Sequence, residues 1–267
     1  MWEEPCISGK EGSGTVFFAG CNLRCVYCQN HEISRASAGV KITVERLADI
    51  FLELRDKGAN NINLVTPTHY VPNIADALEL ARSKGLRLPV VYNSGGYESI
   101  DTLRMLEGYV DVWLPDFKYK SDTAALRYSG ARDYFERASA AIAEMVRQTG
   151  GECVFDRNGI MTRGVIVRHL VLPGQTADSK RILRYLHDTY GDSIYISIMN
   201  QFTPVTDLSA FPEINRTLTE EEYDRVVGFA ERIGITQAYI QVGATAKESF
   251  IPAFDCEGVL PAVHTTE

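Results

Sequence analysis

The sequence predicts an α/β fold in which six strand–helix units form a parallel sheet that can curve into a partial barrel, open on one side. Two observations predict it. Short runs of β-branched and aromatic residues alternate with longer stretches whose apolar residues recur at helical spacing, which is typical of βα units. In addition, a chain of 267 residues, 45% of them hydrophobic, can bury the core of one large domain of this kind.

Six runs are expected to form the strands, because each is short and rich in β-branched or aromatic residues. They are Thr15 to Phe18, Asn61 to Val65, Leu88 to Tyr92, Val110 to Phe117, Gly164 to Leu172 and Ile194 to Met199. No long linker divides the chain, so we expect a single domain over 1–267 with its six-unit core at 12–203. The remainder, 204–267, is expected to supply a C-terminal helix and a segment, Gln237 to Val242 and Gly243 to Asp255, that wraps the open side.

Four helices carry recognisable ends, where a side chain able to accept a hydrogen bond precedes the first turn or glycine follows the last. They are the helix from Thr43 to Gly58, the helix from Asp133 to Gln148 that Gly150 and Gly151 end, the helix that Asp178 opens and Gly191 closes, and the helix opened by the capping box of Thr219 and Glu222. In each, the apolar residues form one stripe, which we expect to pack against the core.

Charge and the absence of targeting signals limit the function classes. A formal net charge of −8 disfavours nucleic acid as a partner, because binding to its backbone depends on lysine and arginine neutralising phosphates. Residues 1–5 show no signal-peptide pattern, and no run approaches the roughly 18 apolar residues of a membrane span. We therefore expect a cytoplasmic protein that binds neither nucleic acid nor membrane.

The most informative feature is a loop directly after the first predicted strand, which carries Cys21, Cys25 and Cys28. Three thiolates on one tight loop can hold three corners of an iron–sulfur cubane. No fourth cysteine follows at a similar spacing, so one iron stays open. A metal with an open coordination position can bind and activate a small molecule, whereas a saturated cluster mostly transfers electrons.

Two other readings of these cysteines are less well supported. A structural zinc site commonly has four ligands and would need Cys153 or Cys256 from far along the sequence. A disulfide within 21–28 would leave an odd thiol, in a chain that shows no other sign of an oxidising compartment. Cys6, like Cys153 and Cys256, is isolated in the sequence and has the pattern of a small buried hydrophobe, so the roles of these three stay open.

The spacing Cys-x3-Cys-x2-Cys, with Tyr27 just before the last cysteine, resembles the signature of the radical S-adenosylmethionine (radical SAM) superfamily. From Gly12 to about Thr203 the chain resembles the pyruvate formate-lyase activating enzymes and their homologues. The resemblance implies an open (β/α)6 barrel and a [4Fe-4S] cluster on the three cysteines, with S-adenosylmethionine (SAM) bound at the open iron. One-electron reduction then yields a 5′-deoxyadenosyl radical that abstracts hydrogen from a substrate C–H bond.

Candidate cofactor contacts lie where strands end, because functional groups of parallel barrels gather at the C-terminal ends of their strands. The resemblance implies that Tyr27 packs near the adenine. After the second strand, Thr66, Thr68 and His69 stand where the family has a Gly-Gly-Glu segment that holds the methionine amino group. The threonines can supply hydroxyls, but the glutamate is absent. His69 is either a contact to cofactor or substrate or a polar loop residue.

After the third strand, Asn93 stands where the family carries an acidic residue, and Ser94 follows it. An amide can hydrogen-bond there but cannot balance an ammonium charge. After the fourth strand, Asp116 and Lys118 resemble the family's Asp-Leu-Lys strand end, whose lysine reaches the cofactor carboxylate or ribose. The two residues can instead form a structural ion pair.

On the fifth strand, Arg168 begins a run that resembles the family's Arg-Tyr-Val-Val-Val-Pro-Gly. Its guanidinium can hold a carboxylate with two hydrogen bonds, and Leu170 would lie along the adenine. Strand alternation places His169 on the opposite, helix-facing side. After the sixth strand, Asn200 and Gln201 stand where adenine contacts are expected in the family, or they give ordinary turn polarity before a proline.

The resemblance also implies partners. Activating enzymes abstract hydrogen from a glycine on a partner enzyme, so we expect a protein or peptide substrate and an electron donor such as flavodoxin or ferredoxin. The same chemistry on a small metabolite or peptide is the alternative, followed by a non-catalytic iron–sulfur or zinc module. The substrate loops carry no local signature that decides among them.

Overall fold

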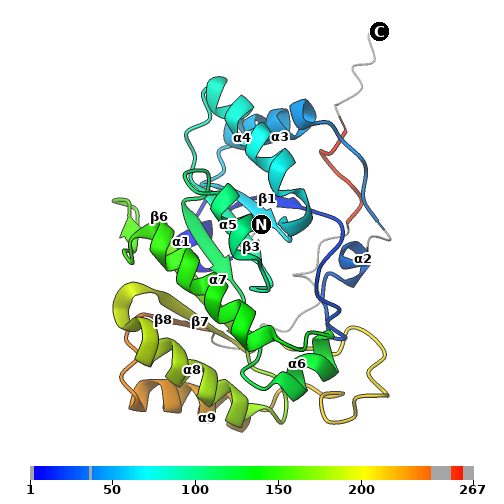
Figure 1. The fold of residues 1–267 in the computed structure, drawn as a ribbon, viewed down its shortest axis with the longest axis vertical. Coiled ribbons are helices and arrows are strands. Elements are labelled where there is room, and N and C mark those ends of the chain that lie inside the picture. Colours follow the sequence, from blue (N-terminus) through cyan, green and yellow to red (C-terminus); the bar gives the residue numbers. More distant parts are fainter. Residues whose placement is uncertain (1–2, 36–37, 242–253, 261–267) are drawn as a thin grey trace.

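In the computed structural model, which describes residues 3–35, 38–241 and 254–260, the strands form one open sheet (Figure 1). Its parallel path runs β1-β2-β3-β4-β6-β7-β8, and β5 pairs antiparallel with β6 at one side. The strands are β1 (Gly14–Phe17), β2 (Ile62–Val65), β3 (Val90–Ser94), β4 (Val112–Pro115), β5 (Val154–Phe155), β6 (Met161–Leu170), β7 (Tyr195–Met199) and β8 (Ala238–Ile240).

The helices follow the strands as βα units require, and neighbouring helices pack in pairs: α3 with α4, α5 with α7, and α8 with α9 (Figure 1). The helices are α1 (Pro5–Ser8), α2 (His31–Ser34), α3 (Val44–Asp56), α4 (Val71–Ser83), α5 (Ile100–Met105), α6 (Asp122–Ser129), α7 (Tyr134–Thr149), α8 (Thr176–Tyr190) and α9 (Glu220–Arg232). Short 3-10 turns span Thr68–Tyr70 and Gly191–Ser193. No helix in the described part of the chain is both long and apolar enough to cross a membrane.

All six predicted strands are confirmed, each within three residues at either end. The expected wrapping segment is wrong over Ala238–Ile240, which lie in the sheet as β8 and pair with β7. Three residues are too short a run to stand out as a strand, and their pairing depends on β7, far back in the sequence. Residues 242–253 of the expected wrapping segment lie outside the described residues. The two-residue β5 was also missed.

The predicted helix ends are confirmed, with one correction. The Thr43 side chain accepts a hydrogen bond from the Arg46 amide, and Thr219 and Glu222 form both halves of a capping box. The correction concerns Asp178, which lies within the first turn of α8 rather than before it. Its buried carboxylate accepts the backbone amides of Lys120 (2.9 Å) and Ser121 (3.3 Å), so it fixes the loop that follows β4.

Strand alternation divides the side chains between two faces. Trp113 and Tyr92 pack in the larger core between sheet and helices. On the other face, Val112 and its neighbours pack in a smaller cluster against Ile7 of α1, so the N-terminal segment fills one end of the partial barrel. Asn61 anchors that segment, because its side chain donates to the Ile7 carbonyl at 2.7 Å. The inner face is therefore apolar at the α1 end, which leaves the opposite end for polar groups.

Candidate functional site

The three cysteines of the sequence motif lie on a loop of residues 20–28, directly after β1, which we call the cluster loop. Cys21, Cys25 and Cys28 are unpaired thiols. Cys21 and Cys25 line a cavity of about 400 Å³, and the Leu23 amide points to the Cys21 sulfur at 3.4 Å. His69, from the end of β2, lines the same cavity, so strand ends and cluster loop meet as predicted.

Two distant segments hold the cluster loop by hydrogen bonds. The amides of Arg24 and Val26 donate to the carbonyls of Ser129 (3.0 Å) and Tyr128 (2.9 Å) at the end of α6. Thr206 donates its hydroxyl to the Val26 carbonyl at 2.7 Å. The backbone of the loop is therefore fixed by parts of the chain about 100 and 180 residues further on.

Burial shapes the chemistry of the thiols. It raises the pKa of Cys25 to about 11, against the opposing effects of the Lys118 ammonium and a hydrogen bond from Ser129. Burial also raises the pKa of Cys21. Both groups are therefore neutral thiols at pH 7 in the metal-free chain. Binding iron requires and drives their deprotonation, because the thiolate is the ligand.

The arrangement of the sulfurs fits a cluster. Within residues 3–35, 38–241 and 254–260, no three His, Cys, Asp or Glu side chains converge on a point that could hold a single metal ion. A four-iron cluster does not require such convergence, because each cysteine binds a different iron at its own corner. Three thiols on one fixed loop, two of them facing a cavity, meet the ligand set of such a cluster.

Within the cluster loop, the side chain of Tyr27 is buried in a hydroxyl network. Its hydroxyl lies 2.5 Å from that of Tyr119, which lies 2.8 Å from the Ser129 hydroxyl. Its ring meets the Phe202 ring edge-on at 5.8 Å. Tyr27 therefore forms a wall of the site next to the residues that follow β7, and its contact with adenine stays a prediction.

The residues that follow β2 contact a carboxylate, that of Glu98, which the sequence analysis did not predict. Thr68 donates a hydrogen bond to Glu98, a buried residue of the loop after β3, and Tyr92 donates another at 3.3 Å. Burial raises the pKa of Glu98, against the hydrogen bonds that favour its charged form. Glu98 is also close enough to Cys21 to contribute to the raised pKa of that thiol. Thr66, the residue directly after β2, has a left-handed backbone, with φ of 57°.

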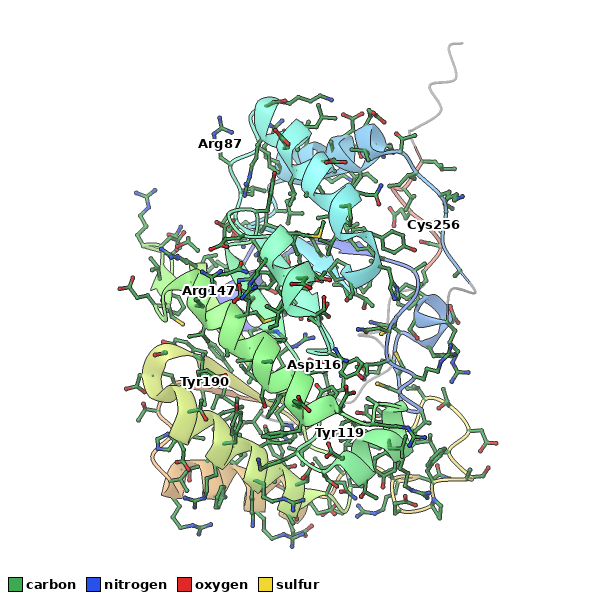
Figure 2. The ribbon with its side chains drawn as sticks, in the orientation of Figure 1. Arg87, Asp116, Tyr119, Arg147, Tyr190 and Cys256 are labelled. Carbon is green, nitrogen blue, oxygen red and sulfur yellow. The ribbon has the colours of Figure 1, made fainter. Side chains whose placement is uncertain are left out.

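Across the barrel, the ends of β3, β4 and β6 meet in a chain of alternating charges. Asp116 pairs with Lys118 and, at 3.0 Å, with Arg168 (Figure 2 labels Asp116). Arg168 also contacts Glu3 at 3.2 Å and the Asn93 side-chain oxygen. Burial opposes the charge of Asp116, but Lys118 and Arg168 outweigh it and hold the pKa of this carboxyl below its usual range.

These contacts bear on three predicted residues. The structural ion pair of Asp116 and Lys118 forms, and the Lys118 ammonium is close enough to Cys25 to lower its pKa. Arg168 uses its Nε, Nη1 and Nη2 atoms on protein partners, so a cofactor carboxylate would have to share or replace one of them. Asn93 is likewise engaged. Their contacts with SAM stay predictions.

The remaining predicted residues lie at the same end of the barrel. Leu170 and Lys118 line a second, small cavity. The Asn200 amide donates to the Gln241 side chain at 3.0 Å, and Gln241 in turn donates to Gln201 at 3.2 Å. Ser94 is buried after Asn93. These residues therefore lie at the end of the barrel that carries the cluster loop, and their contacts with SAM stay predictions.

His169 lies on the side that strand alternation predicts. Of the three isolated cysteines, Cys6 is buried as expected, whereas Cys153 and Cys256 are half-buried. His169 is buried on the helix side, with Nδ1 2.8 Å from the Phe117 carbonyl, as strand alternation predicts. Cys6 is buried beside α1, and Cys153 packs against the same cluster. Cys256, labelled in Figure 2, lies in the segment 254–260. Arg46 of α3 donates hydrogen bonds to the carbonyls of Gly258 and Val259 in this segment. None of these three cysteines belongs to the cluster loop.

The comparisons with known proteins agree with this geometry. The model of the radical SAM superfamily matches residues 15–186, which is well over half of the chain and includes the cluster loop and the strand ends through α8. The chain belongs to the radical SAM superfamily. Members of this superfamily use a [4Fe-4S] cluster and SAM.

Two curated proteins are similar to this chain in sequence. An uncharacterised protein of Methanocaldococcus jannaschii, MJ0674, is 29% identical over 239 residues, covering 85% of this chain and 64% of the relative. A pyruvate formate-lyase-activating enzyme of Clostridium pasteurianum is 26% identical over 192 residues, covering 67% of this chain and 70% of that enzyme. The chain thus spans a little under two thirds of the length of the first of these relatives.

Solved structures confirm the partial-barrel fold. Streptococcus suis SuiB bound to S-adenosylmethionine superposes with a TM-score of 0.58 at 10% identity, covering 85% of this chain and 50% of SuiB. Methylornithine synthase (PylB) superposes with a TM-score of 0.56 at 14% identity, covering 85% of this chain and 63% of PylB. At such identities the likeness concerns the fold alone.

Proposed function

We propose that this chain is an activase-like radical SAM enzyme in which Cys21, Cys25 and Cys28 bind the [4Fe-4S] cluster and the adjoining cavity holds SAM. The observation that carries the proposal is that unpaired cysteines of one fixed loop face a cavity of about 400 Å³ at the C-terminal ends of the strands. When bound, the cluster and SAM supply the one-electron chemistry that removes a hydrogen atom from a substrate C–H bond.

The chain's own side chains bind, orient and shield in this proposal. The buried carboxylate of Glu98 and the half-buried one of Asp116 are suited to positively charged groups of SAM, and the Lys118 ammonium is suited to its carboxylate. Tyr27 and Phe202 form an aromatic wall that keeps water away from the cluster loop. Positioning and solvent exclusion suffice, so no side chain is required as a general acid or base.

The activase-like role is supported by the similarity to the Clostridium pasteurianum activating enzyme. Its substrate would be a glycine of a partner protein, and its electron donor a small redox protein such as flavodoxin or ferredoxin. The test is electron paramagnetic resonance (EPR) of anaerobic mixtures containing SAM, a reductant and a candidate partner protein. A stable organic radical on the partner, absent with Cys25→Ala, supports the role. Turnover of a metabolite without any protein radical would reject it.

A second candidate, the same chemistry on an anionic small molecule or peptide, has one observation in its favour. Arg24 and Arg35 are exposed at the cavity, and neither forms an ion pair within the described ranges. Two unpaired guanidinium groups on a chain of net charge −8 suit an anionic substrate. Screening carboxylate- and phosphate-bearing compounds for SAM-dependent product formation tests it, with Arg35→Gln expected to raise the KM of any hit.

A further inference from the structure

We infer that Ser129 is a positioning residue for the cluster: its hydroxyl donates a hydrogen bond to the Cys25 sulfur and thereby raises the reduction potential of the centre that this sulfur binds. The inference rests on the proposed ligation of the cluster by Cys25. Ser129 Oγ lies 3.0 Å from Cys25 Sγ, and Ser129 is only 2% exposed. Hydrogen bonds to coordinating sulfurs are one of the means by which proteins set cluster potentials.

The direction of this hydrogen bond is fixed by the groups behind it. A serine hydroxyl has one proton, so when Ser129 donates to sulfur its oxygen accepts from Tyr119, 2.8 Å away. The Tyr119 oxygen then accepts from Tyr27, at 2.5 Å. The result is a directed chain from Tyr27 through Tyr119 and Ser129 to Cys25. It begins and ends on the cluster loop, and each bond polarises the next.

The position of the hydroxyl is held by the backbone. Ser129 is the last residue of α6, and Gly130 ends the helix in a left-handed conformation with φ of 70°. The Ser129 carbonyl accepts the Arg24 amide at 3.0 Å, and the Tyr128 carbonyl accepts the Val26 amide at 2.9 Å. Cys25 therefore lies between two backbone hydrogen bonds to the same stretch of α6. The contact between hydroxyl and sulfur is a product of this frame and does not depend on a mobile side chain.

The expected effect follows from charge. Reduction adds an electron to the cluster, which increases the negative charge on its sulfur ligands, so a donor aimed at one of them stabilises the reduced form more than the oxidised form. Ser129 itself is buried, on the protein side of the sulfur, so a water molecule does not readily take the place of its hydroxyl. Removing the hydroxyl should therefore lower the potential, while the backbone contacts of the loop stay intact.

The experiment is an EPR-monitored redox titration of the anaerobically reconstituted protein without SAM. At a fixed poise, Ser129→Ala is expected to raise the ratio of oxidised to reduced cluster by about threefold, roughly 30 mV for a one-electron couple. Ser129→Thr, which keeps the hydroxyl, should return the ratio toward the wild-type value. Tyr119→Phe keeps the Ser129 contact and removes the donor behind it, so it should shift the ratio in the same direction by less.

A matched control separates this effect from general damage to α6. Ser121 caps the other end of the same helix, where its side chain accepts the Ala124 amide. Ser121→Ala should weaken the helix and leave the potential unchanged. If Ser129→Ala binds no cluster, the shift in the reduction potential of Tyr119→Phe decides whether the inference holds. An unchanged midpoint in both Ser129→Ala and Tyr119→Phe overturns the inference, as does an equal shift in Ser121→Ala. A cluster that survives Cys25→Ala would instead reject the proposed ligation.

Discussion

The Thr68 hydroxyl donates a hydrogen bond of 2.9 Å to the carboxylate of Glu98, which joins the end of β2 to the loop after β3. Glu98 is 2% exposed and also accepts a hydrogen bond from Tyr92. The end of β2 offers only hydroxyls and an imidazole in the sequence. In the fold, it has a carboxylate next to it, supplied by the loop that follows the neighbouring strand β3.

Replacing Glu98 with glutamine should weaken SAM binding. SAM carries positive charge on its sulfonium and amino groups, and the substitution removes a buried negative charge beside the proposed cavity. We expect the Kd of SAM to rise about 10- to 100-fold, since a hydrogen bond to a charged group contributes about 1.5–3 kcal/mol. Calorimetric titration of reconstituted protein measures it. Glu79→Gln, exposed on α4, is the control, and an equal Kd in all three proteins would remove Glu98 from the site.

The same substitution should stabilise the fold above the ordinary pKa of glutamate. Burial raises the pKa of Glu98 from 4.5, so the folded state holds its proton over a range where the unfolded chain has released it. Stability therefore falls as pH rises through this window, and below about pH 4.5 the effect vanishes. The Glu98→Gln variant has no ionisable group at this position, so its stability should not fall over this pH range for this reason. Urea unfolding from about pH 5 to about pH 8 should show its advantage growing with pH; a constant difference contradicts the expectation.

Neutralising Asp116 should destabilise the protein strongly. Asp116 pairs with both Lys118 and Arg168, so Asp116→Asn leaves two half-buried cations without their shared anion. We expect a loss of about 3–5 kcal/mol in the free energy of unfolding at pH 7. Because the pKa of Asp116 is lowered, its contribution is present above the ordinary aspartate pKa and disappears as pH falls through the folded value. The exposed Asp224→Asn should change little; similar losses in both would refute the pairing argument.

Thr66→Gly should relieve backbone strain. Thr66 has φ of 57°, a region that costs a residue with a Cβ atom about 1–2 kcal/mol and is least suited to a β-branched side chain. Glycine avoids this cost but loses more backbone entropy on folding, so the free energy of unfolding should rise by a net amount of about 0.5–1 kcal/mol. Thermal unfolding beside Thr66→Ala, which keeps the Cβ, measures it. If alanine stabilises as much as glycine, conformational strain is not the cause.

Much of this architecture could be predicted from the sequence because the signals are local. Alternation along β6 correctly separates Arg168 from His169, and the capping box of Thr219 and Glu222 marks the start of α9. Likewise, the spacing within the cluster loop places Cys21 and Cys28 near enough to Cys25 to contribute to its raised pKa. In such cases the physical cause, a strand period or a helix end, lies within a few residues of the feature it determines.

The features that were missed depend on distant pairing. Glu98 lies 30 residues from Thr68, and Ser129 lies 104 residues from Cys25, so neither contact has a local pattern. Glu3 reaches Arg168 only because α1 fills one end of the barrel. β8 becomes a strand by pairing with β7 and is too short to show a period of its own. These are consequences of the assembled sheet, which one-dimensional signals do not contain.

The central claim is that three cysteines of the cluster loop support reductive cleavage of SAM. Its most direct test is chromatography of 5′-deoxyadenosine formed when anaerobically reconstituted protein is mixed with dithionite and SAM, beside Cys25→Ala reconstituted in the same way. We predict 5′-deoxyadenosine in the wild type and only background in the variant. Equal amounts in the two proteins, or none in a wild type that holds its four irons, would contradict the account.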